Sequence, residues 1–210
     1  MDSVIEILGS AFIMIMSIIL HEIAHGFSAY KLGDPTAKDA GRLTLNPLKH
    51  IDLFGTLILP GILLTLRALG MNTFVLGWAK PVPVNFRLLR NPRRDMMIVA
   101  MAGPLVNILI AWLFSWGLKA DLGDHSIGLH LIQFTVFVNL LLAVFNLMPV
   151  PPLDGSRLVS GILPNKLAYL YNQLEPVGIF IVFGLLYYGL MDMIVFPIIE
   201  MITQSWGINF

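Results

Sequence analysis

Two histidines and a glutamate stand together at the end of a long apolar run. The stretch reads LHEIAHGF, Leu20 to Phe27, and it follows IEILGSAFIMIMSII. Residues four apart in an α-helix differ by about 40° around the axis and about 6 Å along it, so His21 and His25 face the same way. In this H-E-x-x-H pattern the two imidazoles bind zinc, and the glutamate, here Glu22, acts as general base toward the activated water. The pattern therefore predicts a zinc site.

The apolar setting of this motif strengthens the prediction. A charged side chain at the bilayer centre costs about 2.5 to 3.5 kcal/mol on insertion scales, so ionisable residues in membrane helices mark functional sites more often than not. The alternative is an inert polar cluster, hydrogen-bonded at a helix end. Motif, spacing and placement together favour the functional interpretation.

A catalytic zinc needs a third protein ligand and an open position for water. The chain has no cysteine, so the ligand must be His, Asp or Glu. Asp154 is preceded by Pro149, Pro151 and Pro152 and followed by Gly155, which predicts a rigid turn. The pattern favours Asp154 and leaves the other candidates open; these are Asp34, Asp39, His50 and Asp52.

Composition predicts an all-α polytopic membrane protein with one membrane-embedded domain over residues 1–210. Of these residues, 57% are hydrophobic and only 12% are charged. The net charge is zero, which argues against a nucleic-acid partner. The apolar N-terminus lacks a basic region and a small-residue cleavage site, so we expect it to stay in the mature protein.

Hydropathy and length predict about four transmembrane helices. They are Val4 to Tyr30, Met96 to Leu118, Ile127 to Met148, and Pro176 to about Ile199, the last kinked or turned at Pro197.

The apolar segment Ile51 to Leu69 is predicted to be a re-entrant hairpin that turns at Pro60-Gly61. Of the 13 Lys and Arg residues, all but three lie between Lys31 and Arg94, on both sides of this segment. A full span would place one of these basic groups on the wrong side of the membrane. A hairpin keeps both basic loops cytoplasmic.

Two stretches alternate in polarity and predict short β-strands at the cytoplasmic face. They are GRLTLN, Gly41 to Asn46, and FVLGWAKPVPVN, Phe74 to Asn85. The predicted topology puts the N-terminus, the loop Lys119 to Ser126 and the interfacial histidines His125 and His130 outside. It brings the H-E-x-x-H motif and Asp154 to one depth, nearer the cytoplasmic face.

Three motifs in this order resemble the site-2 protease family of intramembrane zinc metalloproteases. They are HEIAH, AGPLVN at Ala102 to Asn107, and NLMPVPPLDG at Asn146 to Gly155. The resemblance covers Ile13 to Leu163, and GRLTLNPLKHID and GWAKPVPVN are similar to its compact branch, which has no PDZ domain. It implies that His21, His25 and Asp154 bind one Zn²⁺, that Glu22 is catalytic and that Asn146 assists it. Gly103-Pro104 and Asn107 are predicted to serve close helix packing.

The predicted function is an intramembrane zinc endopeptidase of the cell membrane. It would hydrolyse peptide bonds within or near transmembrane segments of other proteins, and the enzyme itself would lie in the lipid bilayer. The alternative is a membrane metal transporter or metal-binding protein that uses the same His and Asp residues. Transporters often show repeated halves and ionisable groups strung across the membrane, and this sequence shows neither. A catalytically inactive scaffold is disfavoured by the intact His21, Glu22, His25 and Asp154 set.

Overall fold

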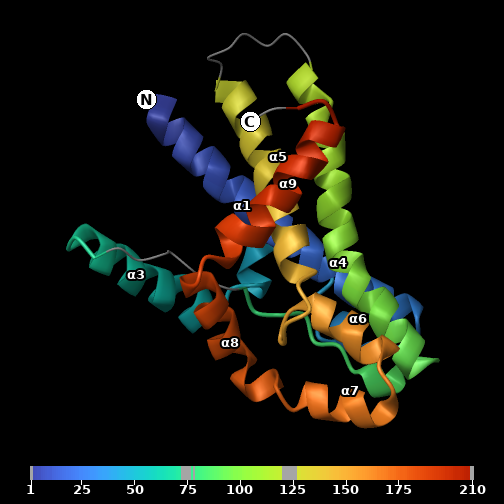
Figure 1. The fold of residues 1–210 in the computed structure, drawn as a ribbon. Helices are drawn as coiled ribbons and strands as arrows, with labels where there is room; N and C mark the ends of the chain where they lie inside the picture. Colours follow the sequence, from blue (N-terminus) through green and yellow to red (C-terminus); the bar gives the residue numbers. More distant parts are fainter. Residues whose placement is uncertain (1, 72–76, 78, 120–126, 209–210) are drawn as a thin grey trace.

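Three long apolar helices form the body of the protein. The computed structural model describes residues 2–71, 77, 79–119 and 127–208. Among these, α1 (Asp2–Lys31), α4 (Pro92–Ser115) and α5 (Ile127–Asn146) are long and apolar enough to cross a membrane. Figure 1 shows both chain ends at one end of this bundle, with the shorter helices α6 (Asp154–Ile162) and α7 (Asn165–Asn172) at the other. The chain is a multi-pass membrane protein.

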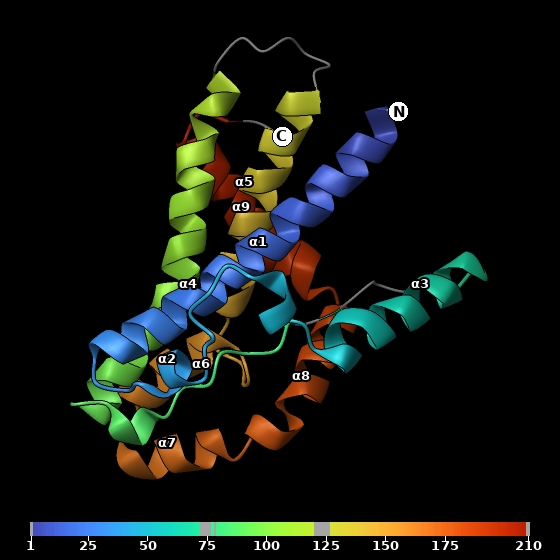
Figure 2. The ribbon, with the colours of Figure 1, turned by 180° about the vertical axis from the view of Figure 1, so that it is seen from behind.

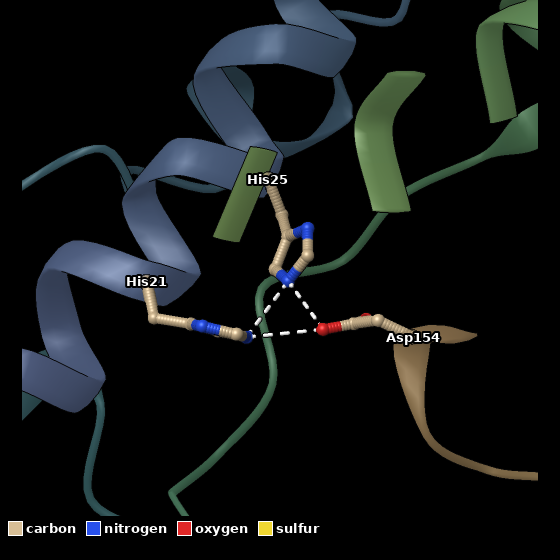
Figure 3. A group of neighbouring side chains, drawn as sticks. All are labelled: His21, His25 and Asp154. Carbon is tan, nitrogen blue, oxygen red and sulfur yellow. Dashed lines mark hydrogen bonds and ion pairs between the residues drawn. The ribbon is translucent and has the colours of Figure 1, made fainter. Parts of the chain in front are cut away.

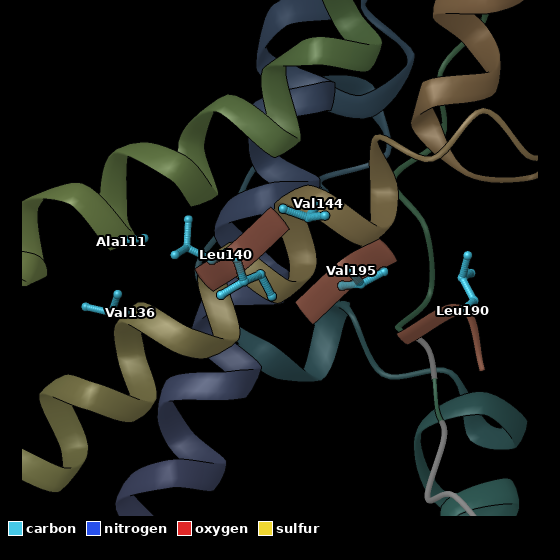
Figure 4. Packing of buried hydrophobic residues seen from close by; sticks show 7 residues of the cluster. Ala111, Val136, Leu140, Val144, Leu190 and Val195 are labelled. Carbon is cyan, nitrogen blue, oxygen red and sulfur yellow. The ribbon is translucent and has the colours of Figure 1, made fainter. Parts of the chain in front are cut away.

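The largest buried cluster joins α4 and α5 to the C-terminal helix α9 (Phe196–Ser205). Ala111 of α4 packs where Val136 and Leu140 of α5 approach it, and all three are fully buried (Figure 4). Small residues such as Ala111 permit the close helix approach on which packing in lipid depends. α4 also packs along α1, so it is the central helix of the three.

The predicted fourth span, Pro176 to Ile199, is not one helix. α8 (Glu175–Tyr187) ends before Gly189, whose φ of +86° is a conformation that favours glycine, and a π-helical turn η5 (Met191–Val195) leads into α9. Pro197 lies in the first turn of α9, where a missing N–H is tolerated, and so it does not kink a longer helix. α7 and α8 meet at a bend of 68° and count as a fourth span only as a broken pair.

The predicted hairpin turn at Pro60-Gly61 is wrong. The π-helix η2 (Leu53–Ile58) continues directly into α3 (Leu59–Ala68), and Pro60 occupies the first turn of α3. The chain nevertheless comes back: a Cβ placed on Gly77 would lie 2.7 Å from the Gly55 carbonyl oxygen. The return therefore begins beyond Ala68, where Gly70 has a φ of +86°. Figures 1 and 2 show α3 projecting sideways from the bundle.

The predicted β-strands do not form in the part of the chain that the structure describes. Residues 79–85 have no regular secondary structure, and Pro81 and Pro83 lack the N–H groups that a ladder needs. A backbone hydrogen bond from Lys80 N to His50 O at 2.9 Å joins this segment to His50, which lies beyond the predicted strand Gly41 to Asn46. Trp78 and His125, and the loop between α4 and α5 beyond Lys119, lie outside the described residues. The remaining short helices are α2 (Thr36–Asp39), η1 (Pro47–Lys49), η3 (Phe86–Leu88) and η4 (Gly117–Lys119).

Candidate metal centre

His21, His25 and Asp154 come together although the aspartate lies far from the histidines in sequence (Figure 3). The two Nε2 atoms are 2.9 Å apart, and each lies 3.1 Å from Oδ2 of Asp154. Ligand atoms on a tetrahedral zinc, with bonds of about 2.0 to 2.1 Å, are about 3.3 Å apart. The triangle is therefore close to one face of a zinc tetrahedron.

The hydrogen bonds of the two rings turn their Nε2 atoms toward this centre. His25 Nδ1–H donates to the Val99 carbonyl at 2.7 Å, and His21 Nδ1–H donates to Asn107 Oδ1 at 2.5 Å. This tautomer, assigned from the acceptors, leaves Nε2 as a lone pair on each ring. Two lone pairs and a carboxylate oxygen then face one another at about 3 Å, an arrangement that a cation between them stabilises. The donor set thus fits Zn²⁺.

A buried amide network extends behind His21. The Asn107 side-chain NH2 donates to Asn139 Oδ1 at 2.8 Å, and the Asn139 NH2 donates to Ser17 Oγ and the Thr135 carbonyl, both at 2.9 Å. Asn107 and Asn139 are fully buried, and the network connects α1, α4 and α5. The structure thus adds a hydrogen-bonding role to the packing role predicted for Asn107. Asn139 and Ser17 were missed, although a polar side chain within an apolar span is a signal for such a role.

Gly103 forms the wall of the centre on the α4 side. A Cβ on Gly103 would lie 2.7 Å from His21 Nε2 and closer still to His25 Nε2. Only glycine leaves room for both rings and an ion at this point of α4.

The Asp154 carboxylate is placed by a turn that is held from several sides. Tyr171 of α7 donates its hydroxyl hydrogen to the Pro149 carbonyl at 2.9 Å. Gly178 of α8 lies against the Pro151 carbonyl, and Gly155 lies against the Leu147 carbonyl, so a side chain at either glycine would displace the turn. The Asp154 side chain is 22% exposed, whereas both histidine side chains are almost covered. The centre opens on the aspartate side.

The two predicted catalytic residues differ in their contacts. Glu22 Oε2 accepts a hydrogen bond of 2.6 Å from the backbone N–H of Val82. Asn146 is the last residue of α5, and its side-chain NH2 donates to the Leu142 carbonyl at 2.9 Å. The roles of both in catalysis stay predictions.

The competing ligand candidates bind backbone groups elsewhere. Asp34 accepts from the N–H of Asn85 at 2.6 Å, and Asp52 accepts from the N–H of Gly55 at 2.6 Å. His50 Nε2 donates to the Thr44 carbonyl at 2.9 Å. Asp39 is exposed. In the described part of the chain, Asp154 is the acidic residue that joins the two histidines.

Comparison with known proteins also supports a zinc site, because the similar proteins are zinc metalloproteases by name. The model of Peptidase family M50 matches residues 119–188. The chain is 39% identical to the "Putative zinc metalloprotease YwhC" of Bacillus subtilis, over 83% of this chain and 77% of that protein. It is 34% identical to the "Putative zinc metalloprotease Rip2" of Mycolicibacterium smegmatis, over 67% of this chain and 52% of that protein. It is 23% identical to the "Zinc metalloprotease MJ0392" of Methanocaldococcus jannaschii, over 93% and 47%. The chain thus spans about half the length of the last two, and no solved structure matches it.

Replacing Gly103 with alanine is expected to abolish zinc binding, because the new methyl group occupies the space between the two Nε2 atoms. Metal analysis of the purified variant measures this. Gly184→Ala is the matched control, since a Cβ on Gly184 of α8 meets nothing within 4 Å. Full zinc occupancy in Gly103→Ala would show that the ion does not sit against α4.

Replacing Asn107 with leucine removes the acceptor for His21 Nδ1–H and is expected to weaken zinc binding about 10- to 100-fold. Competition with a chelator of known affinity measures the change. Thr135→Val is the control, because the Thr135 hydroxyl donates to the Leu131 carbonyl of its own helix and its backbone carbonyl still accepts from Asn139. Equal losses in both variants would assign the effect to buried polarity in general.

Proposed function

The chain belongs to peptidase family M50, the family of the site-2 proteases, and on that premise we propose that it is an intramembrane endopeptidase acting on transmembrane segments of other proteins. It is a zinc metalloprotease with several apolar helices. The observation that carries the proposal is the convergence of His21, His25 and Asp154 on one point, with two of the three residues on a membrane-spanning helix.

The depth of the site supports a substrate bond that lies within or near the membrane. His21 and His25 precede Lys31, the end of α1, by about 15 Å and 9 Å along the helix. The basic residues gather beyond this end, between Lys31 and Arg94. Basic loops are retained on the cytoplasmic side, so we place the active site nearer the cytoplasmic face of the cell membrane.

The chemistry follows from the residues that surround the centre. His21, His25 and Asp154 would hold one Zn²⁺, which when bound supplies the Lewis acidity that makes water nucleophilic near neutral pH. The Glu22 carboxylate accepts a proton from the attacking water as the water oxygen bonds to the scissile carbonyl carbon. Glu22 then delivers that proton to the amide nitrogen as the C–N bond breaks, which leaves a carboxyl group and an amine.

Asn146 is proposed to assist this step from the end of α5. Its amide NH2 would donate to the oxygen on which negative charge develops. The amide has two N–H groups, and one of them donates to the Leu142 carbonyl, so the other would donate to the substrate oxygen.

The transporter alternative gains nothing from the structure. The described residues contain one cluster of three or more metal-ligating side chains, where a transport path would need further sites along the membrane normal. Membership of a peptidase family also favours the enzyme.

The Glu22→Gln variant tests this function. Glutamine keeps the shape of the side chain but cannot accept the proton, so cleavage of a co-expressed transmembrane substrate is expected to fall at least about 100-fold. Zinc content should remain near that of the wild type, because Glu22 is not among the ligands.

Glu200→Gln on the exposed face of α9 is the control and is expected to cut normally. A Glu22→Gln protein that cuts at the wild-type rate would exclude Glu22 as the base. A wild-type protein without zinc would exclude the metal site itself.

A further inference from the structure

A proline-rich segment, residues 79–85, contacts Glu22 through a single backbone group. The Val82 N–H donates to Glu22 Oε2 at 2.6 Å. Residues 81 and 83 on either side are prolines and have no N–H, so this is the one backbone donor of the Pro81–Pro83 tripeptide. We propose that Val82 is a positioning residue for the proposed reaction: its N–H fixes one oxygen of Glu22 so that the other, Oε1, faces the reacting water. The proposal rests on the proposed function of Glu22 as base.

The segment is held in place independently of Glu22. Arg42, itself buried, donates from its guanidinium to the Lys80 carbonyl at 2.7 Å, and the Lys80 N–H donates to the His50 carbonyl at 2.9 Å. At the other end, the Asn85 N–H donates to the fully buried carboxylate of Asp34 at 2.6 Å. The segment runs beside the C-terminal half of α1 between these anchors (Figure 2).

The Val82 side chain sets the distance between this segment and α1. It is buried, and it rests on Gly26, where a Cβ would lie 2.7 Å from Val82 Cγ1 and 2.8 Å from Leu43 Cδ2. Gly26 follows the zinc-ligand candidate His25 directly. The Val82 side chain thus packs on the part of α1 that contains Glu22. This packing fixes the distance between the Val82 N–H and the Glu22 carboxylate.

A fixed donor is useful to a general base because an unheld carboxylate samples several rotamers, and only some of them reach the water. If the carboxylate is already held in place, the entropy cost of ordering it is not part of the activation free energy. The opposite interpretation is that the N–H occupies Glu22 and must release it before catalysis. The anchors at Lys80 and Asn85 favour positioning, since they hold the donor in place whether or not Glu22 is engaged.

The test compares Val82→Pro with Val84→Pro, each of which removes one N–H from the same segment. For Val82→Pro we expect kcat on a transmembrane model substrate to fall at least about 10-fold, with KM and zinc content unchanged. Val84→Pro is expected to keep kcat, because the Val84 side chain packs near Ala29, Leu89 and Val99 rather than at Glu22. Unchanged or increased kcat in Val82→Pro overturns the proposal, and so does a parallel loss of zinc.

A second pair of variants keeps the proposal testable if proline disturbs the fold. Incorporation of the α-hydroxy analogue of valine at position 82 or at position 84 replaces one N–H with an ester oxygen and leaves the side chain intact. The ester at 82 should reproduce the fall in kcat, and the ester at 84 should not. The ester at 82 is also placed in a Glu22→Asp protein, because the shorter Asp side chain is expected not to reach Val82. In that protein the ester should lower kcat no further. An equal fall in kcat there overturns the proposal. Failure of the proposed function is distinguishable, because it appears as absent cleavage or absent zinc in the wild-type protein.

Discussion

The structure depends on three electron-pair donors that face one another across about 3 Å. His21 Nε2, His25 Nε2 and Asp154 Oδ2 repel when nothing lies between them, and a bound cation would turn that repulsion into an attraction between α1 and α6. Because the two helices lie far apart in sequence, this shared ion would add a long-range link to the packing of α6 on α4, as well as forming the reactive centre.

The residues through which α1 and α4 contact each other at the site recur every four positions on both helices. On α1, Ser17, His21 and His25 recur every fourth position, and on α4 the partners Val99, Gly103 and Asn107 do the same. In this antiparallel pair, Val99 accepts from His25, Gly103 leaves room for both rings, and Asn107 accepts from His21. One register of two helices therefore sets both ring orientations. A shift of α4 by one turn would place a side chain where the ion belongs.

Local sequence predicted which side chains converge better than it predicted the path of the chain. The spacing of His21, Glu22 and His25 needs only helix geometry, and Asp154 could be ranked first because its proline-rich turn was placed at their depth. The turn at Pro60 and the single helix through Gly189 were mispredicted because proline is tolerated in a first helical turn, and because hydropathy does not register a positive φ. The predicted strand Phe74 to Asn85 failed in its described part because Pro81 and Pro83 lack the N–H groups of a ladder. In the predicted strand Gly41 to Asn46, Gly41 has a φ of +62°, which is a turn conformation and not that of a strand. The partners Asn139 and Ser17 could not be assigned to His21 without the register of α1 against α4 and α5.

Consecutive residues of the H-E-x-x-H motif contact different parts of the molecule. His21 and Glu22 point about 100° apart around α1, so His21 turns to the buried Asn107 amide of α4 while Glu22 turns to the backbone of residues 79–85. The two histidines are thereby oriented by the membrane bundle, and the base candidate is contacted by a segment anchored through Arg42 and Asp34. Such a division keeps the two histidine rings within the buried contacts of the apolar helices. It also places Glu22, the proposed base, beside the more polar chain at the end of the bundle.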